Sequence, residues 1–167
     1  CQLDVSNPLK PFVYYREQNI LVTLDNTLSQ QGNTIDLRSF DFAQVEMVGA
    51  SRDNCYWIWD APRSSLMRVD KDMKVLQTTP NLGNLLGIEL NPMSVTETAS
   101  AVYLTDQKAG VLAFDIFGTY RSRLPISFDG EVQVSGGHFL YHRGKELFIA
   151  SPDIPGEQVI PLPSVPG

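Results

Sequence analysis

Residues 55–77 of the chain read CYWIWDAPRSSLMRVDKDMKVLQ, and this stretch contains the pattern that decides the fold. A run of aromatic and apolar residues ends at Asp60, a polar loop follows, and a second apolar run ends at Asp70. Short runs of this composition, bounded by turn-forming residues, are typical of β-strands joined as hairpins. The stretch therefore predicts a strand, a loop, a second strand, a tight turn and a third strand.

The pattern repeats along the chain at a fixed distance. Apolar runs end in an aspartate at Asp25, Asp70 and Asp115, which are 45 residues apart. Aspartate tolerates the backbone conformations of a tight turn between neighbouring strands, so we interpret these three residues as turn formers. A period of about 40 to 45 residues, with four short strands in each unit, is typical of a β-propeller blade.

Helical patterns are nearly absent from the chain. The best candidate is 80–90, where four leucines share one face, but Gly83 and Gly87 interrupt it, so only a short turn of helix is expected. The chain is therefore predicted to be all-β, with residues 1–167 forming a single β-propeller domain. The four expected four-stranded blades cover residues 3–37, 45–78, 93–126 and 132–163.

Composition limits the kinds of partner. The 167 residues include 13 Lys and Arg against 19 Asp and Glu, which gives a net charge of −6. A chain without a basic cluster has no means of displacing counterions from a phosphate backbone, so no nucleic-acid partner is expected. No apolar run approaches the ~20 residues that a membrane-spanning helix needs. Contact with a membrane is therefore expected only through a lipid.

Two of the units resemble a known class of protein. Residues 55–77 and the stretch VYLTDQKAGVLAFDIFGTYRSRLP at 102–125 resemble blades of NHL-type and TolB-like six-bladed propellers. They are closer still to an uncharacterised group of bacterial envelope propellers with the same order of tyrosine-bearing strand, loop and Leu-x-x-Asp. The resemblance covers almost the whole chain and implies a binding or scaffold surface in the cell envelope, with no catalytic residues to transfer. Propellers usually have more than four blades, so the chain is either a four-bladed ring or part of a larger propeller, and we favour the second.

The two cysteines have different interpretations. Cys55 lies in an aromatic strand, where a thiol behaves as a small buried apolar group. Cys1 is open to two hypotheses: it is the acylated first residue of a bacterial lipoprotein, or it is an ordinary blade residue preceded by further blades. Both agree with an exported protein of the periplasm or outer membrane.

Catalytic and metal-binding patterns are weak. His138 and His142 are four residues apart, which on a strand places them roughly 13 Å from each other at ~3.3 Å per residue, too far to share one ion. A Ser-His-Asp triad can be assembled on paper from Ser135, His142 and Asp106, but no motif supports it. We therefore expect no cofactor, no metal and no enzyme activity.

One enzyme hypothesis is kept as the alternative. A propeller hydrolase of the lactonase type would hold a divalent ion in its central channel. Glu46, Glu97 and Glu131 are the candidate ligands by their position on the innermost strands.

A binding surface is the function that we favour. In a propeller, the loops between second and third strands and the connections between blades converge on one face. Arginine and tryptophan there are typical of protein contacts. The candidate binding residues are Arg16, Trp59, Arg63, Asp106, His142, Leu85 and Leu86.

Some of these candidates have a second, structural interpretation. The leucines of 79–91 could instead fill the channel or cover a blade edge. Trp59 shares its side of the strand with Trp57, so both could pack between blades. The sequence thus predicts a non-enzymatic protein-binding or scaffold propeller of the bacterial cell envelope. Such a protein could be a lipoprotein anchored through Cys1, or a subunit of a larger complex whose open edges another chain completes.

Overall fold

The computed structural model describes residues 1–7, 9–152 and 154–161. Its strands form four antiparallel four-stranded sheets, and each sheet is built from consecutive strands in chain order. The first two sheets consist of β1 (Gln2–Asp4), β2 (Phe12–Tyr15), β3 (Ile20–Thr23) and β4 (Ile35–Asp36), then β5 (Val45–Ser51), β6 (Cys55–Asp60), β7 (Ser65–Val69) and β8 (Val75–Thr78). The other two consist of β9 (Pro92–Glu97), β10 (Ala101–Asp106), β11 (Gly110–Asp115) and β12 (Tyr120–Leu124), then β13 (Asp129–Ser135), β14 (His138–Arg143), β15 (Glu146–Ser151) and β16 (Ile154–Ile160).

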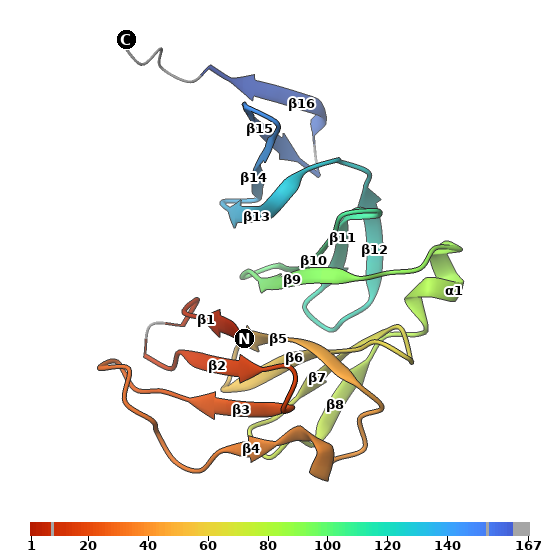
Figure 1. Ribbon diagram of the computed structural model, residues 1–167. Helices are drawn as coiled ribbons and strands as arrows, with labels where there is room; N and C mark the ends of the chain where they lie inside the picture. The colour runs from red at the N-terminus through yellow and green to blue at the C-terminus, as the bar shows by residue number, and fades with distance from the viewer. Residues whose placement is uncertain (8, 153, 162–167) are drawn as a thin grey trace.

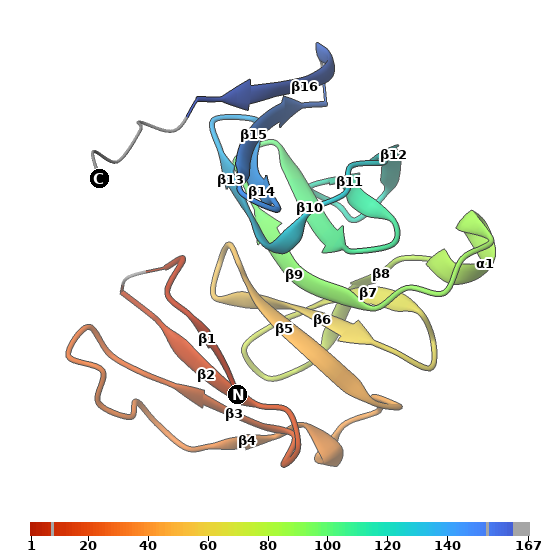
Figure 2. The ribbon, with the colours of Figure 1, turned by 45° about the horizontal axis from the view of Figure 1, so that its top comes forward.

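The four sheets follow one another around an arc, with the first and fourth sheets at its two ends (Figure 1). Turning the molecule shows the same arc from another side, with the opening between its ends (Figure 2). The innermost strands β1, β5, β9 and β13 are neighbours from one sheet to the next. The predicted all-β architecture of four four-stranded units is confirmed.

The bounds of the second unit match the observed strands, and those of the other units differ from them by one to three residues where the structure describes them. The outer strand of the first sheet contains only Ile35 and Asp36, because the Asp36 carboxylate accepts a hydrogen bond from the Arg38 backbone and starts a 3-10 helix, Leu37–Ser39. The predicted end of the last unit at residue 163 lies outside the described residues.

The helix predicted within 80–90 is the five-residue α1, Leu82–Leu86. Its N-cap is Asn81, whose side-chain oxygen accepts the backbone N–H of Asn84. It ends at Gly87, which has a φ of 67°, the left-handed conformation that favours glycine at this position.

Each of the three repeated aspartates forms the same kind of turn, which lies between the third and fourth strands of its sheet. In each turn, the aspartate Oδ1 accepts the backbone N–H groups two and four residues later. The backbone N–H of the aspartate itself donates to the carbonyl four residues later. The residue three positions on, which is Leu28, Met73 or Gly118, has a positive φ. The predicted role of Asp25, Asp70 and Asp115 as turn formers is therefore confirmed.

The hydrophobic core lies between the sheets. Every residue of β6 is buried, because alternate side chains point into two different interfaces. Tyr56 and Ile58 pack against the first sheet, whereas Trp57 and Trp59 pack against the third. A further cluster, in which the rings of Tyr103 and Phe139 meet edge to face, joins the third and fourth sheets. The middle sheets therefore bury both of their faces.

The turn at Asp70 gives a first prediction. Asp70→Ala removes the acceptor of two backbone N–H groups and is expected to lower the free energy of unfolding by about 1–2 kcal/mol. Asp72→Ala is the matched control, because the Asp72 carboxylate in the same turn is largely exposed and pairs with the exposed Lys71 ammonium, and it is expected to cost less than about 0.5 kcal/mol. Urea unfolding of both variants measures the difference, and equal losses would contradict the role of Asp70.

Candidate functional site

One end of each sheet carries the loops between second and third strands and also the connections to the next sheet. Both emerge at the same end because neighbouring strands run in opposite directions. We call this the upper face; it includes α1 and the connection 79–91. The opposite end carries the aspartate turns.

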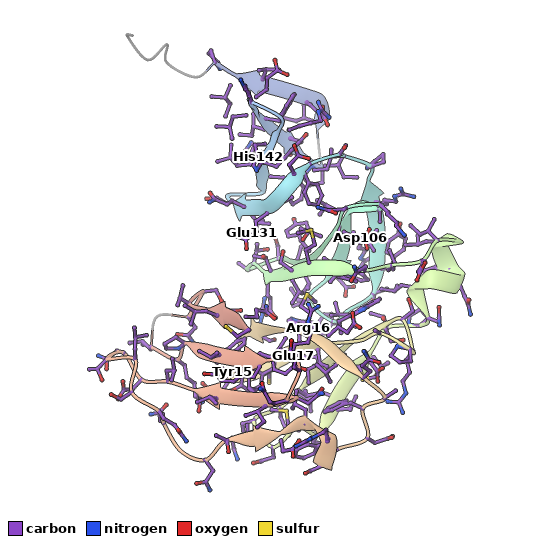
Figure 3. The ribbon with its side chains drawn as sticks, viewed as in Figure 1. Tyr15, Arg16, Glu17, Asp106, Glu131 and His142 are labelled. Carbon is purple, nitrogen blue, oxygen red and sulfur yellow. The ribbon has the colours of Figure 1, made fainter. Side chains whose placement is uncertain are left out.

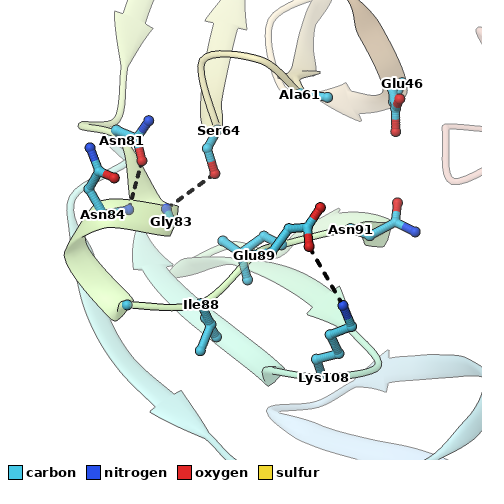
Figure 4. Close-up of a pocket in the computed structure, with 12 residues that line it drawn as sticks. Glu46, Ala61, Ser64, Asn81, Gly83, Asn84, Ile88, Glu89, Asn91 and Lys108 are labelled. Carbon is cyan, nitrogen blue, oxygen red and sulfur yellow. Dashed lines mark hydrogen bonds and ion pairs between the residues drawn. The ribbon is translucent and has the colours of Figure 1, made fainter.

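A groove of about 980 Å³ lies on the upper face, between the second and third sheets. One wall is the connection 79–91 with α1, and the other residues around it include Glu46, Ala61, Ser64 and Lys108 (Figure 4). We call it the upper-face groove. It joins residues of two sheets that are more than 40 positions apart in the sequence.

Hydrogen bonds fix the wall of the groove to the second sheet. The Gly83 backbone donates to Ser64 Oγ at 3.1 Å, and the Asn81 side chain donates to the Arg63 carbonyl at 2.9 Å. The Leu82 side chain is fully buried beside Trp57 and Trp59. The groove is therefore formed before any ligand arrives, which lowers the entropy cost of binding.

The groove has a polar and net acidic lining. The Glu89 carboxylate and the Lys108 ammonium approach to 4.0 Å, and both side chains are largely exposed, so this pair contributes little stability. Glu46 adds a second carboxylate, which accepts a hydrogen bond from the Gln44 side chain at 2.9 Å. Asn84 and Asn91 bring amides, which can both donate and accept.

The leucine segment divides into buried and exposed side chains. Leu86 is half-buried and packs against the core cluster between the second and third sheets, together with Ile88. Leu85, which follows the groove residue Asn84 in α1, is 53% exposed and does not line the groove. Leu82 and Leu86 thus contribute to the core between the two blades, and the binding role of Leu85 stays a prediction.

Two predicted binding residues are corrected by the structure. Trp59 is only 1% exposed, because the alternation of β6 directs it into the core with Trp57. Asp106 is also 1% exposed, and its carboxylate accepts the backbone N–H groups of Asn91, Lys108 and Ala109. Asp106 holds two loops in place and does not face a partner.

Asp60 has the same function as Asp106 at the equivalent end of β6. Its side chain is fully buried and accepts the backbone N–H groups of Ala43 and Gln44. Arg63 lies beside it, at 3.0 Å from Asp60 and 3.1 Å from Asp41. Sequence reasoning missed these structural aspartates, although their shared place at the end of a second strand was a visible signal.

The remaining predicted residues are not brought together into one site. Figure 3 shows Arg16, Asp106 and His142 on three different sheets. Arg16 and His142 are exposed, and Arg63 is half-buried. Cys1 is exposed. Cys55 is buried, as predicted, and its burial raises the pKa of its thiol. The binding roles of Arg16, Arg63 and His142 and the lipid on Cys1 stay predictions.

The glutamates of the alternative enzyme hypothesis are not gathered into a metal site. Within the described residues, no group of three or more His, Cys, Asp or Glu side chains could hold a metal ion. Glu97 is instead engaged by other groups: Trp57 Nε1 and Ser51 Oγ each donate to its carboxylate at 2.6 Å, and Arg52 forms an ion pair with it. Its side chain is only 6% exposed, and these contacts tie the third sheet to the second.

The structure does not form the Ser-His-Asp triad of Ser135, His142 and Asp106 either. The Asp106 carboxylate instead accepts hydrogen bonds from the backbone N–H groups of Asn91, Lys108 and Ala109. Ser135 pairs with His138 at the opposite end of β14 from His142.

No helix in the described part of the chain is long and apolar enough to cross a membrane.

Comparison of this architecture with solved structures shows which fold it has. The chain superposes on a streptogramin B lyase with a TM-score of 0.65 and 14% identity, covering 96% of this chain and 54% of that one. It superposes on PorZ, a surface component of the type-IX secretion system of Porphyromonas gingivalis, with a TM-score of 0.62 and 13% identity, covering 95% and 22%. These neighbours are β-propellers. The chain has a β-propeller fold.

A further lyase structure gives a similar match. Virginiamycin B lyase from Staphylococcus aureus matches with a TM-score of 0.63 and 15% identity over 97% of this chain and 55% of that one. The propeller thus spans about half the length of the lyase chains that it matches. No family model and no curated protein matches the sequence. The four sheets are therefore four blades, and the likeness establishes the fold alone.

The Glu97 cluster gives a prediction about pH. Burial raises the pKa of Glu97, but hydrogen bonds from Ser51, Arg52 and Trp57 outweigh it and hold the pKa below its usual value. The stabilisation is therefore present above the unfolded-state pKa of about 4.3 and is lost as the pH falls through the lower folded-state pKa. Glu97→Gln is expected to cost about 1–3 kcal/mol at pH 7 and much less at pH 3.

Urea unfolding at both pH values measures this change. Glu89→Gln is the control, because the Glu89 side chain is 90% exposed, and it should change stability at neither pH. A penalty for Glu97→Gln that is the same at pH 7 and pH 3 would show that its charge does not join the blades.

The two roles within the leucine segment can be separated by substitution. Leu85→Asp is expected to change the free energy of unfolding by less than about 0.5 kcal/mol, because the side chain is already exposed. Leu82→Asp buries a charge in the core and is expected to abolish folding. Thermal unfolding monitored by tryptophan fluorescence tests both, and an unfolded Leu85→Asp would place Leu85 in the core instead.

Proposed function

We propose that this propeller is a non-enzymatic binding module of the bacterial cell envelope, and that it holds an extended polypeptide segment with basic side chains in the upper-face groove. The observation that carries the proposal is the groove itself, a hollow with a fixed wall, a net acidic lining and an exposed leucine on the helix that forms its wall. Propeller loops gathered on one face are a common place for binding.

Charge supports a basic partner. Glu46 and Glu89 line the groove against a single cation, Lys108, which Glu89 already approaches. The whole chain also carries a net charge of −6, so its field attracts positively charged segments. A lysine or arginine of the partner would meet the two carboxylates.

The shape and polarity of the groove support an extended peptide. An extended backbone leaves its N–H and C=O groups unpaired along its length, and Asn84 and Asn91 can donate to and accept from such groups. Leu85 offers an apolar contact next to them. Polar positioning groups around a small apolar anchor are typical of specific binding sites.

The envelope location is part of the proposal. It is supported by the resemblance of the blades to a group of bacterial envelope propellers, and by the match to a bacterial surface component of a secretion system. A lipid on the exposed Cys1 would hold the propeller at a membrane surface without a membrane-spanning helix. The partner is accordingly proposed to be another protein, within a membrane-associated complex.

Peptide binding tests the proposal. Two sets of fluorescent ten-residue peptides differ only in having Arg or Glu at the same positions among Ser, Leu and Ala, and fluorescence polarisation measures their affinity. Arg peptides are expected to bind and Glu peptides are not. The double variant Glu46→Gln, Glu89→Gln is expected to weaken Arg-peptide binding about tenfold, or roughly 1.4 kcal/mol.

Glu17→Gln is the matched control, because Glu17 is exposed on a neighbouring loop of the upper face but lies outside the groove. It should leave the affinity unchanged. Equal binding of the Arg and Glu sets, or an equal loss in the control, would reject the groove as the site.

A further inference from the structure

Among the described residues that line the upper-face groove, Lys108 carries the only positive charge. Its ammonium lies 4.0 Å from the carboxylate of Glu89, which is one of the two acidic residues of the groove. Figure 4 shows the Lys108 side chain extending toward Glu89. The chain thus places a cation of its own where the proposed partner would bring one.

The backbone of Lys108 is held in the third blade by two side chains. Its N–H donates to the buried carboxylate of Asp106 at 2.7 Å, and its carbonyl accepts a hydrogen bond from Arg123 at 3.3 Å. Arg123 also donates to the carbonyl of the next residue, Ala109, at 2.7 Å. The point from which the Lys108 side chain extends is therefore fixed.

The backbone near Glu89 is fixed by the same aspartate. The other carboxylate oxygen of Asp106 accepts the backbone N–H of Asn91, two residues after Glu89, at 2.6 Å. One buried carboxylate thus sets the spacing between the two backbone segments that carry Lys108 and Glu89. A group that is tethered so close to its partner acts at a high effective concentration, because the contact is intramolecular.

The two charged side chains are nevertheless free to separate. The Lys108 side chain is 70% exposed and that of Glu89 is 90% exposed. Their nitrogen–oxygen distance of 4.0 Å is longer than a hydrogen bond, so they attract each other only as charges screened by water. Another cation can therefore replace the Lys108 ammonium at Glu89 without disturbing the blade that carries Lys108.

We propose that Lys108 is a built-in competitor that limits the affinity of the upper-face groove for basic side chains. A lysine or arginine of the partner has to displace Lys108 before it can pair with Glu89. The displaced ammonium stays tethered beside the groove and continues to compete. This inference rests on the proposed function, because it concerns the regulation of the same binding site.

Removal of the charge at Lys108 tests the competitor with the fluorescent Arg peptides described above. Lys108→Gln is expected to bind them about three- to fivefold more tightly than the wild type, as suits an exposed charge pair. Lys108→Arg keeps the cation and should keep the wild-type affinity. In a chain that also carries Glu89→Gln, Lys108→Gln should gain less than about 1.5-fold, because the carboxylate for which Lys108 competes is gone.

Lys145→Gln is the matched control. It changes the net charge by the same amount, and Lys145 is exposed on a loop of the upper face that lies outside the groove. Its affinity for the Arg peptides should equal that of the wild type. Circular dichroism and urea unfolding should show wild-type folding for Lys108→Gln, because the Lys108 side chain is largely exposed.

The outcomes separate this inference from the proposed function. If the wild type binds Arg peptides and Lys108→Gln binds them equally or more weakly, the competitor is overturned and the proposed function stands. An equal gain with and without the Glu89 carboxylate would also overturn it, because Lys108 would then act by general repulsion. If Arg peptides bind neither protein, the proposed function and the competitor are both rejected, whereas binding to Lys108→Gln alone would support both.

Discussion

The alternation of side chains along the second strand of each sheet is the constraint on which the structure depends. A strand sends successive side chains to opposite faces of its sheet. In β6, Tyr56 and Ile58 therefore contribute to the interface with the first blade, and Trp57 and Trp59 to the interface with the third. Burying apolar surface on both sides gives each middle blade two neighbours and orders the four sheets around an arc.

Buried carboxylates add hydrogen bonds to the apolar contacts that hold the blades and their loops together. Backbone N–H groups at the ends of strands lose water as the blades pack, and each needs an acceptor. Asp60 and Asp106 supply one for the loops of the upper face, and Glu97 accepts from Trp57 in the neighbouring blade. These acidic residues account for part of the chain's negative charge, and their function is to join blades and loops.

The upper-face groove depends on the same packing. Its wall stays in place because Leu82 is buried with the two tryptophans and because Ser64 and Arg63 hold α1 and its cap. Glu46, Glu89 and Asn84 line the groove, and their side chains do not belong to the core. The basic polypeptide segment that we propose as the partner follows from this acidic, polar lining.

The sequence by itself determined the repeat, the strands and the turns. The 45-residue spacing of Asp25, Asp70 and Asp115 is a local signal, because each aspartate bonds only to the backbone of its own turn. Only the tertiary structure decided which of the candidate residues are buried. Trp59 and Asp106 were both candidates for the binding surface, although the alternation along its strand also allowed Trp59 to pack between blades. Both are buried, since a side chain is covered only where another blade or loop packs against it.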